Sequence, residues 1–256
     1  MNEDRSALAE MRAVTISREY GSGGGEIAAR LAKRLRWQLI DHEVVVRVAE
    51  KLRVSEGEAE EHDECVESLP SRIFKSLRLF HPTMPITVDI PFRVDSRAFH
   101  EARSLIIEGA VASGQVVIVG RGAQAHLAQR NDVLHVRIIA PLEARIAYVL
   151  SREGLDQEAA RARILQKDQE HTRYLETFYH RRPSDPHLYD LVLSTGILDL
   201  ESAVDVISIV LERKAKRLSI PEQDLGPAEG LSRYPGQPED FHPSKEDLRG
   251  RTTNER

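Results

Sequence analysis

The sequence predicts an α/β fold in which a five-stranded parallel sheet carries helices on both faces. Short runs of apolar, β-branched residues alternate along the chain with longer segments whose apolar residues recur at helical spacing. Strands that are apolar on both faces are typical of parallel sheets buried between two layers of helices. A cluster of glycines also stands where the first strand passes into the first helix, which indicates a sharp turn there.

The elements follow from these patterns in chain order. Residues 13–17 form the first expected strand, and the helix from Glu26 to about Leu35 has one apolar face. The remaining strands are expected at 37–40, 116–119, 134–140 and 190–194. The remaining helical segments are expected at about 43–64 and 96–112, after Pro141, from a cap at Asp156 to about Tyr179, and at 200–218.

We expect all of these elements to belong to one domain, residues 13–217. Two largely helical insertions, at about 42–112 and 152–186, interrupt its alternating pattern. Residues 1–12 are polar and are expected to be a flexible N-terminus. Residues 218–256 are rich in Pro, Gly and charge without periodicity, so we expect a disordered tail.

Composition limits the classes of protein to which the chain can belong. It has 36 basic and 41 acidic residues and a formal net charge of −5, which argues against general affinity for nucleic acid or for an anionic membrane. A single cysteine, Cys65, excludes an intrachain disulfide. Since the chain has no long apolar run, we expect no membrane span, no signal peptide and a cytoplasmic location. The sequence leaves the oligomeric state unknown.

The stretch SREYGSGGGEIA, residues 17–28, allows three interpretations. The first is a tight turn alone, but four glycines occupy the five consecutive positions from Gly21, which is more than such a turn requires. A dinucleotide-binding turn is the second, because Asp41 ends the next strand 20 residues after Gly21, where a ribose-binding acid would stand. Against it, Glu26 replaces the third glycine of G-x-G-x-x-G. The third is a phosphate-binding loop, in which N–H groups at a helix N-terminus face an anion.

A second part of the chain bears on these three interpretations. The segment VVIVGRGAQAHLAQRNDVLHVRIIAPLEARIAYVL, residues 116–150, follows the pattern of nucleoside monophosphate kinases of the cytidylate kinase group. REYGSGGGEIA and YDLVLST also match that group, and the interval from Asp41 to Arg47 in DHEVVVR equals the group's. Over roughly residues 13–215 the chain therefore resembles the cytidylate kinase-like family, a divergent branch of the P-loop kinases.

The resemblance implies an ATP-dependent nucleoside monophosphate kinase that transfers the γ-phosphoryl group of ATP to CMP or dCMP, with Mg²⁺ bridging the donor phosphates. The partner it implies is thus a nucleoside monophosphate substrate. The insertion at about 42–112 would bind that substrate, and the charged insertion at about 152–186 would be the lid that closes over the donor.

The same matching assigns roles to individual residues. Arg121 and Arg47 would hold the acceptor phosphate, and Asp41 would lie near the acceptor or the magnesium. Gly122 would also lie at the substrate, where the group has an aspartate. Arg173 would be the lid cation that stabilises the transition state. The donor phosphates would be held by the loop, namely by Tyr20, Gly21, Ser22, Gly23, Gly24, Gly25 and Glu26.

The loop lacks the lysine that ATP-binding loops carry. Gly24 stands in its place, and no serine or threonine follows it for the magnesium. A lost lysine costs several kcal/mol of transition-state stabilisation unless another cation replaces it. We predict that Arg18, just before the glycines, supplies this charge as a catalytic residue. Ser17 and Ser22 would offer hydroxyl groups to the metal ion.

Two other functions stay open at this point. The absent lysine favours a nucleotide-binding, P-loop-like regulatory domain without kinase turnover. An NAD(P)-binding oxidoreductase is the weaker alternative. It would use Asp41 to bind ribose, but it leaves the GRGA turn at 120–123 and the arginine-rich segment at 152–186 without a role.

Overall fold

The computed structural model describes residues 7–41, 96–120, 122–221 and 224–226. The chain divides into two units, Met1–Leu218 and Ser219–Arg256. The first unit holds every strand and α-helix described below. Most of the expected disordered tail lies outside the described residues.

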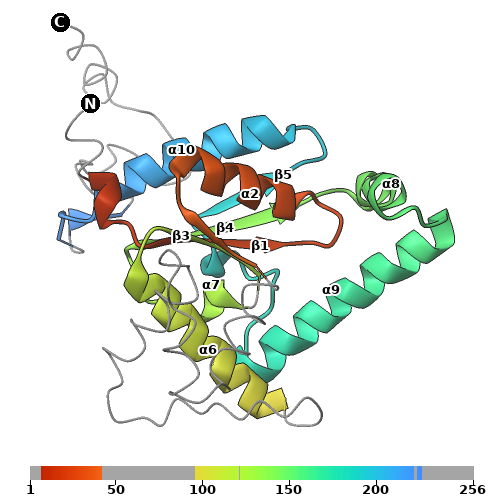
Figure 1. Cartoon of the computed structure of the whole chain (residues 1–256), viewed down its shortest axis with the longest axis horizontal. Helices are drawn as coiled ribbons and strands as arrows, with labels where there is room; N and C mark the ends of the chain where they lie inside the picture. Colours follow the sequence, from red (N-terminus) through yellow and green to blue (C-terminus); the bar gives the residue numbers. More distant parts are fainter. Residues whose placement is uncertain (1–6, 42–95, 121, 222–223, 227–256) are drawn as a thin grey trace, which may run out of the picture. The chain divides into compact units, whose positions relative to one another are not determined.

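The sheet has five strands in the order β2-β3-β1-β4-β5, and every pair of neighbours is parallel. This confirms the predicted sheet (Figure 1). The strands lie within a residue or two of their expected positions because each is a short apolar run with clear breaks. They are β1 (Ala13–Arg18), β2 (Gln38–Ile40), β3 (Val116–Val119), β4 (Val133–Ile139) and β5 (Leu191–Ser194).

The strand order argues against a dinucleotide-binding fold. In the classic dinucleotide fold, β2 lies directly beside β1. Here β3 lies between them, since Val14 pairs with Val117 on one side and with Leu134 on the other. Asp41, after β2, is thus two strands away from the glycine loop that follows β1, and the topology does not support the NAD(P) alternative.

Helices α2 (Gly24–Leu35) and α10 (Leu200–Ala215) cover one face of the sheet (Figure 1). Both are amphipathic as expected, and their apolar faces meet the sheet in one core that excludes water. The two helices also contact each other, with Arg34 paired to Asp205 and Glu201 at the surface. The core residues they contribute include Ile27, Leu31, Ala203, Val204, Ile207 and Leu211.

The N-terminal segment differs from its prediction. Residues 7–10 are helical, and Met11 is fully buried in the core beside α2 and α10. Residues 7–12 are therefore packed rather than flexible, because one large apolar side chain is enough to dock this short segment. Residues 1–6 lie outside the described part of the chain.

Helices α6 (Ser96–Ser113), α7 (Ala123–His126) and α9 (Gln157–Tyr179) lie on the other side of the sheet (Figure 1). Helix α7 was not predicted from the sequence. It is a single turn, and its N-cap residue Gly122 has the left-handed conformation. The capping of α9 was predicted: the Asp156 carboxylate accepts the N–H of Ala159 at 2.8 Å. Stacked rings of His100 and Phe178, 4.2 Å apart, join α6 to α9.

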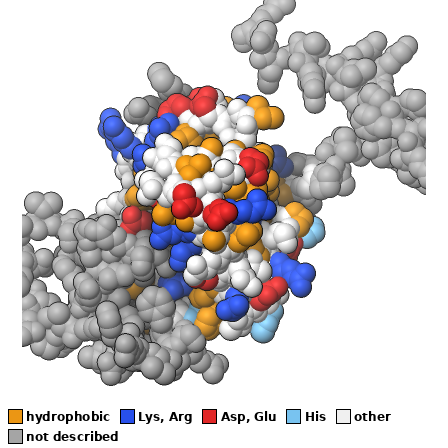
Figure 2. Space-filling view, turned by 90° about the vertical axis from the view of Figure 1, so that its right-hand side faces the viewer, with side chains coloured by type: hydrophobic (Ala, Val, Ile, Leu, Met, Phe, Trp, Pro, Cys, Tyr) orange, Lys and Arg blue, Asp and Glu red, His pale blue; other side chains and the backbone are white. Residues whose placement is uncertain are grey.

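Helix α8 (Leu142–Glu153) follows Pro141 as expected and packs against the first half of α9. Figure 2 shows acidic and basic side chains mixed over the face that carries α8 and the start of α9. Arg163 on this surface pairs with Glu153 at 2.6 Å. No helix in the described part of the chain is long and apolar enough to cross a membrane.

Candidate active site

The glycine loop has the backbone that an anion-binding turn requires. Gly21 and Gly23 have positive φ angles of 82° and 76°, a conformation that other residues rarely adopt. Gly23 caps α2 and makes no side-chain hydrogen bond, so the cap residue leaves the first N–H groups of the helix open. Free N–H groups at a helix N-terminus attract phosphate.

The space beside Gly24, where ATP-binding loops carry the lysine, is filled by Arg18. Gly24 is buried, and a Cβ atom added to it would lie 2.7 Å from the Cβ of Arg18. That distance is shorter than Cβ atoms tolerate, so the Arg18 side chain occupies the space in which a side chain at 24 would begin. A side chain at 24 would therefore collide with the first carbons of Arg18, so the position of Arg18 over this turn requires glycine at 24.

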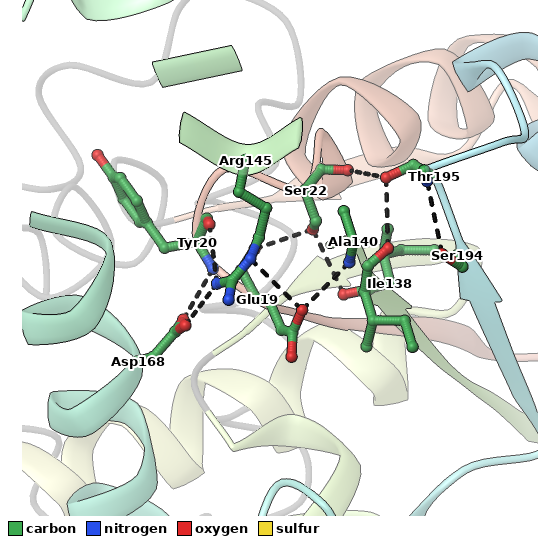
Figure 3. A network of polar contacts seen from close by, with 11 residues as sticks. Glu19, Tyr20, Ser22, Ile138, Ala140, Arg145, Asp168, Ser194 and Thr195 are labelled. Carbon is green, nitrogen blue, oxygen red and sulfur yellow. Dashed lines mark hydrogen bonds and ion pairs between the residues drawn. The ribbon is translucent and has the colours of Figure 1, made fainter. Parts of the chain in front are cut away.

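The loop is anchored to the ends of β4 and β5 (Figure 3). The buried Ser22 hydroxyl donates to the carbonyl of Glu19 at 2.8 Å and lies 3.3 Å from that of Ile138. Thr195, just after β5, donates from its hydroxyl to the carbonyl of Ser22 at 2.8 Å. Side-chain and backbone bonds thus fix the turn before any ligand arrives.

Helices α8 and α9 clamp the start of the loop (Figure 3). Asp168 of α9 accepts the N–H of Tyr20 at 2.9 Å and pairs with Arg145 of α8 at 2.5 Å. The largely buried Arg145 also donates to the carbonyl of Tyr20 at 3.3 Å. Glu19 accepts the N–H of Ala140 at 3.1 Å and lies 3.6 Å from the Nε of Arg145. The sequence analysis missed this network, because its members come from distant segments.

Arg18 is a half-buried cation without a partner among the described residues. Its Nη1 packs against Gly120 at the end of β3, where an added Cβ would lie only 2.0 Å away. Desolvation by burial lowers the pKa of its guanidinium, which still stays charged because arginine titrates far above neutral pH. A buried charge with no counter-ion is costly, so this site favours binding of an anion.

A cavity of about 290 Å³ opens beside Arg18. It lies at the carboxyl ends of β1 and β4 and is closed by α9 and the segment after it, at the edge where open α/β sheets bind ligands. All but one of its lining residues have a polar or charged side chain: Arg18, Glu19, Arg137, Asp168, His171, Thr172, Glu176, Arg182, Pro183 and Ser184.

Arg137 is a lining residue that the sequence analysis did not single out. It stands in the largely apolar strand β4, which also holds His135, and it is in register with Ser17 of β1. Its Nη1 donates to the Ser17 hydroxyl at 2.9 Å, and its guanidinium carbon lies 5.6 Å from the centre of the Tyr189 ring. A charged residue inside an apolar strand was the available signal.

The residues predicted at the acceptor are only partly described. Arg121 and Arg47 lie outside the described residues. Asp41 directly follows β2 and is half-buried, and Gly122 follows the neighbouring strand β3, so both lie at the carboxyl edge. Gly122 has a φ of +69° and packs on α9, since an added Cβ would lie 2.8 Å from the Tyr179 ring. An aspartate at 122 would not fit this contact.

The predicted metal and lid residues have the following surroundings. Ser17 accepts a hydrogen bond from Arg137, and Ser22 donates to backbone carbonyls. Within the described ranges, no group of three or more His, Cys, Asp and Glu residues could hold a metal ion. Arg173 is exposed on α9 and does not line the cavity, whereas Asp168 and Thr172 of the same helix do. The roles assigned to Ser17, Ser22 and Arg173 stay predictions.

Comparison with known proteins gives a consistent family. A model described as the cytidylate kinase-like family matches residues 13–197 of the chain. The cytidylate kinase of Methanopyrus kandleri is 30% identical over 132 residues, which cover 50% of this chain and 66% of that protein. The cytidylate kinase of Ignicoccus hospitalis is 28% identical over 207 residues, which cover 78% of this chain and 99% of that protein.

Two further matches define the extent of the similarity. The solved structure of an uncharacterized protein from Eubacterium ventriosum has a TM-score of 0.58 at 20% identity, and the match covers 79% of this chain and 99% of that one. It shows the same fold. A uronate isomerase from Corynebacterium glutamicum is 31% identical over 105 residues, which cover 41% of this chain and 20% of that protein. The matches thus span less than two thirds of the Methanopyrus and Corynebacterium proteins.

Proposed function

Because the chain belongs to the cytidylate kinase-like family, we propose that it is an ATP-dependent nucleoside monophosphate kinase acting on CMP or dCMP. It has the fold of a P-loop kinase, a five-stranded parallel sheet with its glycine loop between β1 and α2. The cytidine acceptor is supported by two relatives that are named cytidylate kinases and are 30% and 28% identical to this chain.

In the proposed reaction, an oxygen of the acceptor phosphate forms a bond to the γ-phosphorus of ATP. The bond from that phosphorus to the β–γ bridging oxygen breaks, and ADP leaves with the electron pair. Such a transfer depends mainly on positioning and on charge stabilisation. The N–H groups of residues 21–25 would hold the donor phosphates at the N-terminus of α2. Arg121 and Arg47 would hold the acceptor.

The position of Arg18 is the main support for the proposal. It fills the space beside Gly24, lines the cavity and forms no ion pair or hydrogen bond with a described residue. A guanidinium in that place can donate two parallel hydrogen bonds to phosphate oxygens. It would therefore supply the charge that the loop lysine brings to other P-loop kinases.

Magnesium would enter with the nucleotide. Mg²⁺ keeps several water ligands and is commonly held by substrate phosphates together with one or two protein groups, so it does not require a cluster of carboxylates. Ser17 and Ser22 are the hydroxyl groups expected for this role, but both are buried and already bonded, Ser17 to Arg137 and Ser22 to backbone carbonyls, so neither could bind the ion without giving up such a contact. When bound, the ion would neutralise charge on the donor phosphates.

The direct test is an assay of ADP release with each nucleoside monophosphate in turn, with and without Mg²⁺. We expect Mg²⁺-dependent release that is fastest with CMP or dCMP. A preference for another monophosphate would change the proposed acceptor but still support kinase activity. No release with any of them would reject the kinase.

The regulatory alternative remains the second candidate because Gly24 stands where a lysine is expected. A P-loop-like domain that binds nucleotide without turnover would be stabilised against heat by ATP, because a ligand that binds only the folded state raises its stability. It would release no ADP in the assay above. Thermal unfolding with ATP, CMP, AMP and NAD therefore complements the kinetic experiment.

A further inference from the structure

The charges around the cavity divide into paired and unpaired groups. Arg182 pairs with Glu176, Nε to Oε1, at 3.0 Å. The carboxylates of Asp168 and Glu19 both face Arg145, at 2.5 and 3.6 Å. These contacts account for every carboxylate that lines the cavity.

Two lining guanidinium groups remain, those of Arg18 and Arg137. Neither forms an ion pair with a described carboxylate, and they extend from the neighbouring strands β1 and β4. The cavity therefore presents two positive charges for which the described residues supply no counter-ion. An anionic ligand would neutralise them.

The side chain of Arg137 is held in a fixed position. Its Nη1 donates to the fully buried Ser17 hydroxyl at 2.9 Å and lies 3.4 Å from the hydroxyl of Tyr189. The Tyr189 hydroxyl in turn donates to the carbonyl of Pro183 at 3.0 Å, at the cavity wall. No described residue accepts a hydrogen bond from Nε or Nη2 of Arg137.

We infer that Arg137 is a second phosphate-binding residue, which acts with Arg18 on the phosphate groups of the nucleotide in this cavity. The inference rests on the proposed function for the identity of the ligand. A guanidinium whose Nη1 is anchored can offer Nε and Nη2 together to two phosphate oxygens, in the bidentate geometry that arginine provides.

A purely structural role explains this residue less well. Leu134, Val136 and Ile138 belong to the apolar core beneath α2 and α10, whereas Arg137 lies on the opposite face of β4, where the other polar side chain, His135, is hydrogen-bonded to Thr15. An arginine kept only for packing would introduce an uncompensated charge beside the buried Ser17, which costs stability. Phosphate binding gives that charge a counter-ion.

Two variants test the inference, Arg137→Met and Arg137→Lys. Methionine keeps much of the volume without the charge, and lysine keeps the charge without the planar pair of donors. Arg130→Met is the matched control, because Arg130 is exposed and bound to Asp132, away from the cavity. Thermal unfolding of each variant without ligand checks that it folds.

Kinetics of the folded variants should show a fall in kcat/KM of about ten-fold or more for Arg137→Met, and a smaller fall for Arg137→Lys. A rise in KM for ATP alone would assign Arg137 to the donor, and a rise for CMP alone to the acceptor. A fall in kcat would assign it to the transferring group. Values within about two-fold of the wild type in both variants would overturn the inference.

A binding arm separates this inference from the proposed function. If the wild type releases no ADP with any monophosphate, the kinase proposal fails, and the inference is then judged on the thermal shift given by ATP and by inorganic tripolyphosphate. A shift in the wild type and in Arg130→Met that is lost in Arg137→Met would support phosphate binding by Arg137. An equal shift in Arg137→Met, or none in the wild type, would overturn it. Should Arg137→Met fail to fold, Arg137→Lys decides by the same criteria.

Discussion

Among single residues, Arg18 before the glycines would replace the lysine that other P-loop kinases carry after them. Arg18 and Gly24 fit together because the arginine Cβ occupies the space next to the glycine. The positive charge thus reaches the cavity from β1 instead of from the helix. Its position beside Gly120 brings the ends of β1 and β3 into one site.

Replacing Arg18 with alanine should lower kcat by about 30- to 1000-fold, because loss of one positioned cation costs about 2–4 kcal/mol of transition-state stabilisation. The ADP-release assay measures it. Arg30→Ala is the control, since Arg30 is exposed on α2 and pairs with Glu201 at 3.4 Å, and it does not line the cavity. Equal turnover in the two variants would show that Arg18 carries no catalytic charge.

Gly24 and Gly25 form a matched pair for testing the steric argument. Gly24→Ala should destabilise the fold by about 1–3 kcal/mol, because the new Cβ meets that of Arg18 inside a packed turn. Gly25→Ala should change stability by less than about 0.5 kcal/mol, since nothing lies within 4 Å of its added Cβ. Urea unfolding compares them. Equal losses of stability in the two variants would mean that a methyl group at 24 is no more crowded than one at 25.

At the scale of elements, the candidate lid helix α9 is tied to the phosphate loop in this conformation. Asp168 accepts the N–H of Tyr20 and pairs with Arg145 of α8, so helix and loop share one partly buried network. Gly122 adds a second close contact, between the turn after β3 and the rings of α9. Movement of α9 would therefore displace both the glycine loop and the turn after β3.

Asp168→Asn should weaken this connection without changing its shape. The amide can still accept from Tyr20, but the largely buried Arg145 loses its nearest charge partner, so we expect a stability loss of about 2–4 kcal/mol. We also expect a higher KM for ATP. Glu170→Gln, on the exposed side of α9, is the control for stability. If the two variants have the same free energy of unfolding, the contacts of Asp168 with Tyr20 and Arg145 contribute nothing to stability.

At the scale of the whole molecule, a buried histidine in the sheet makes stability depend on pH. Burial, with a smaller contribution from Lys214, lowers the pKa of His135 to about 4, although Asp190 acts in the opposite direction. The unfolded chain binds this proton at its ordinary pKa of about 6.5. Stability is therefore complete above that value and falls as the pH drops toward 4.

His135→Asn should reduce this dependence. Between pH 7.5 and pH 5 the histidine should account for about 2 kcal/mol of lost unfolding free energy. The asparagine variant keeps an acceptor for Thr15, which bonds His135 at 2.8 Å in the wild type. Urea titrations at the two pH values should show a smaller loss in the variant. An equal loss would assign the dependence to other groups.

The sequence predicted the sheet and most helices because each is a short, strongly patterned segment with a visible boundary, such as the cap at Asp156. The packing of Met11 was not predicted, since a single apolar residue has no periodicity. The site was only partly predicted. Arg18 was singled out through the glycines beside it, and its catalytic role stays a prediction. Arg137, Arg145 and Asp168 reach the loop from distant segments, and one sequence carries no signal for contacts of that kind.

A crystal structure with a non-hydrolysable ATP analogue and CMP would decide whether the glycine loop and Arg18 bind the donor. We expect triphosphate oxygens on the N–H groups of residues 21–25, with the Arg18 guanidinium within hydrogen-bonding distance of a phosphate. A triphosphate bound away from these glycines, or an Arg18 side chain turned away from it, would rule out the proposed site.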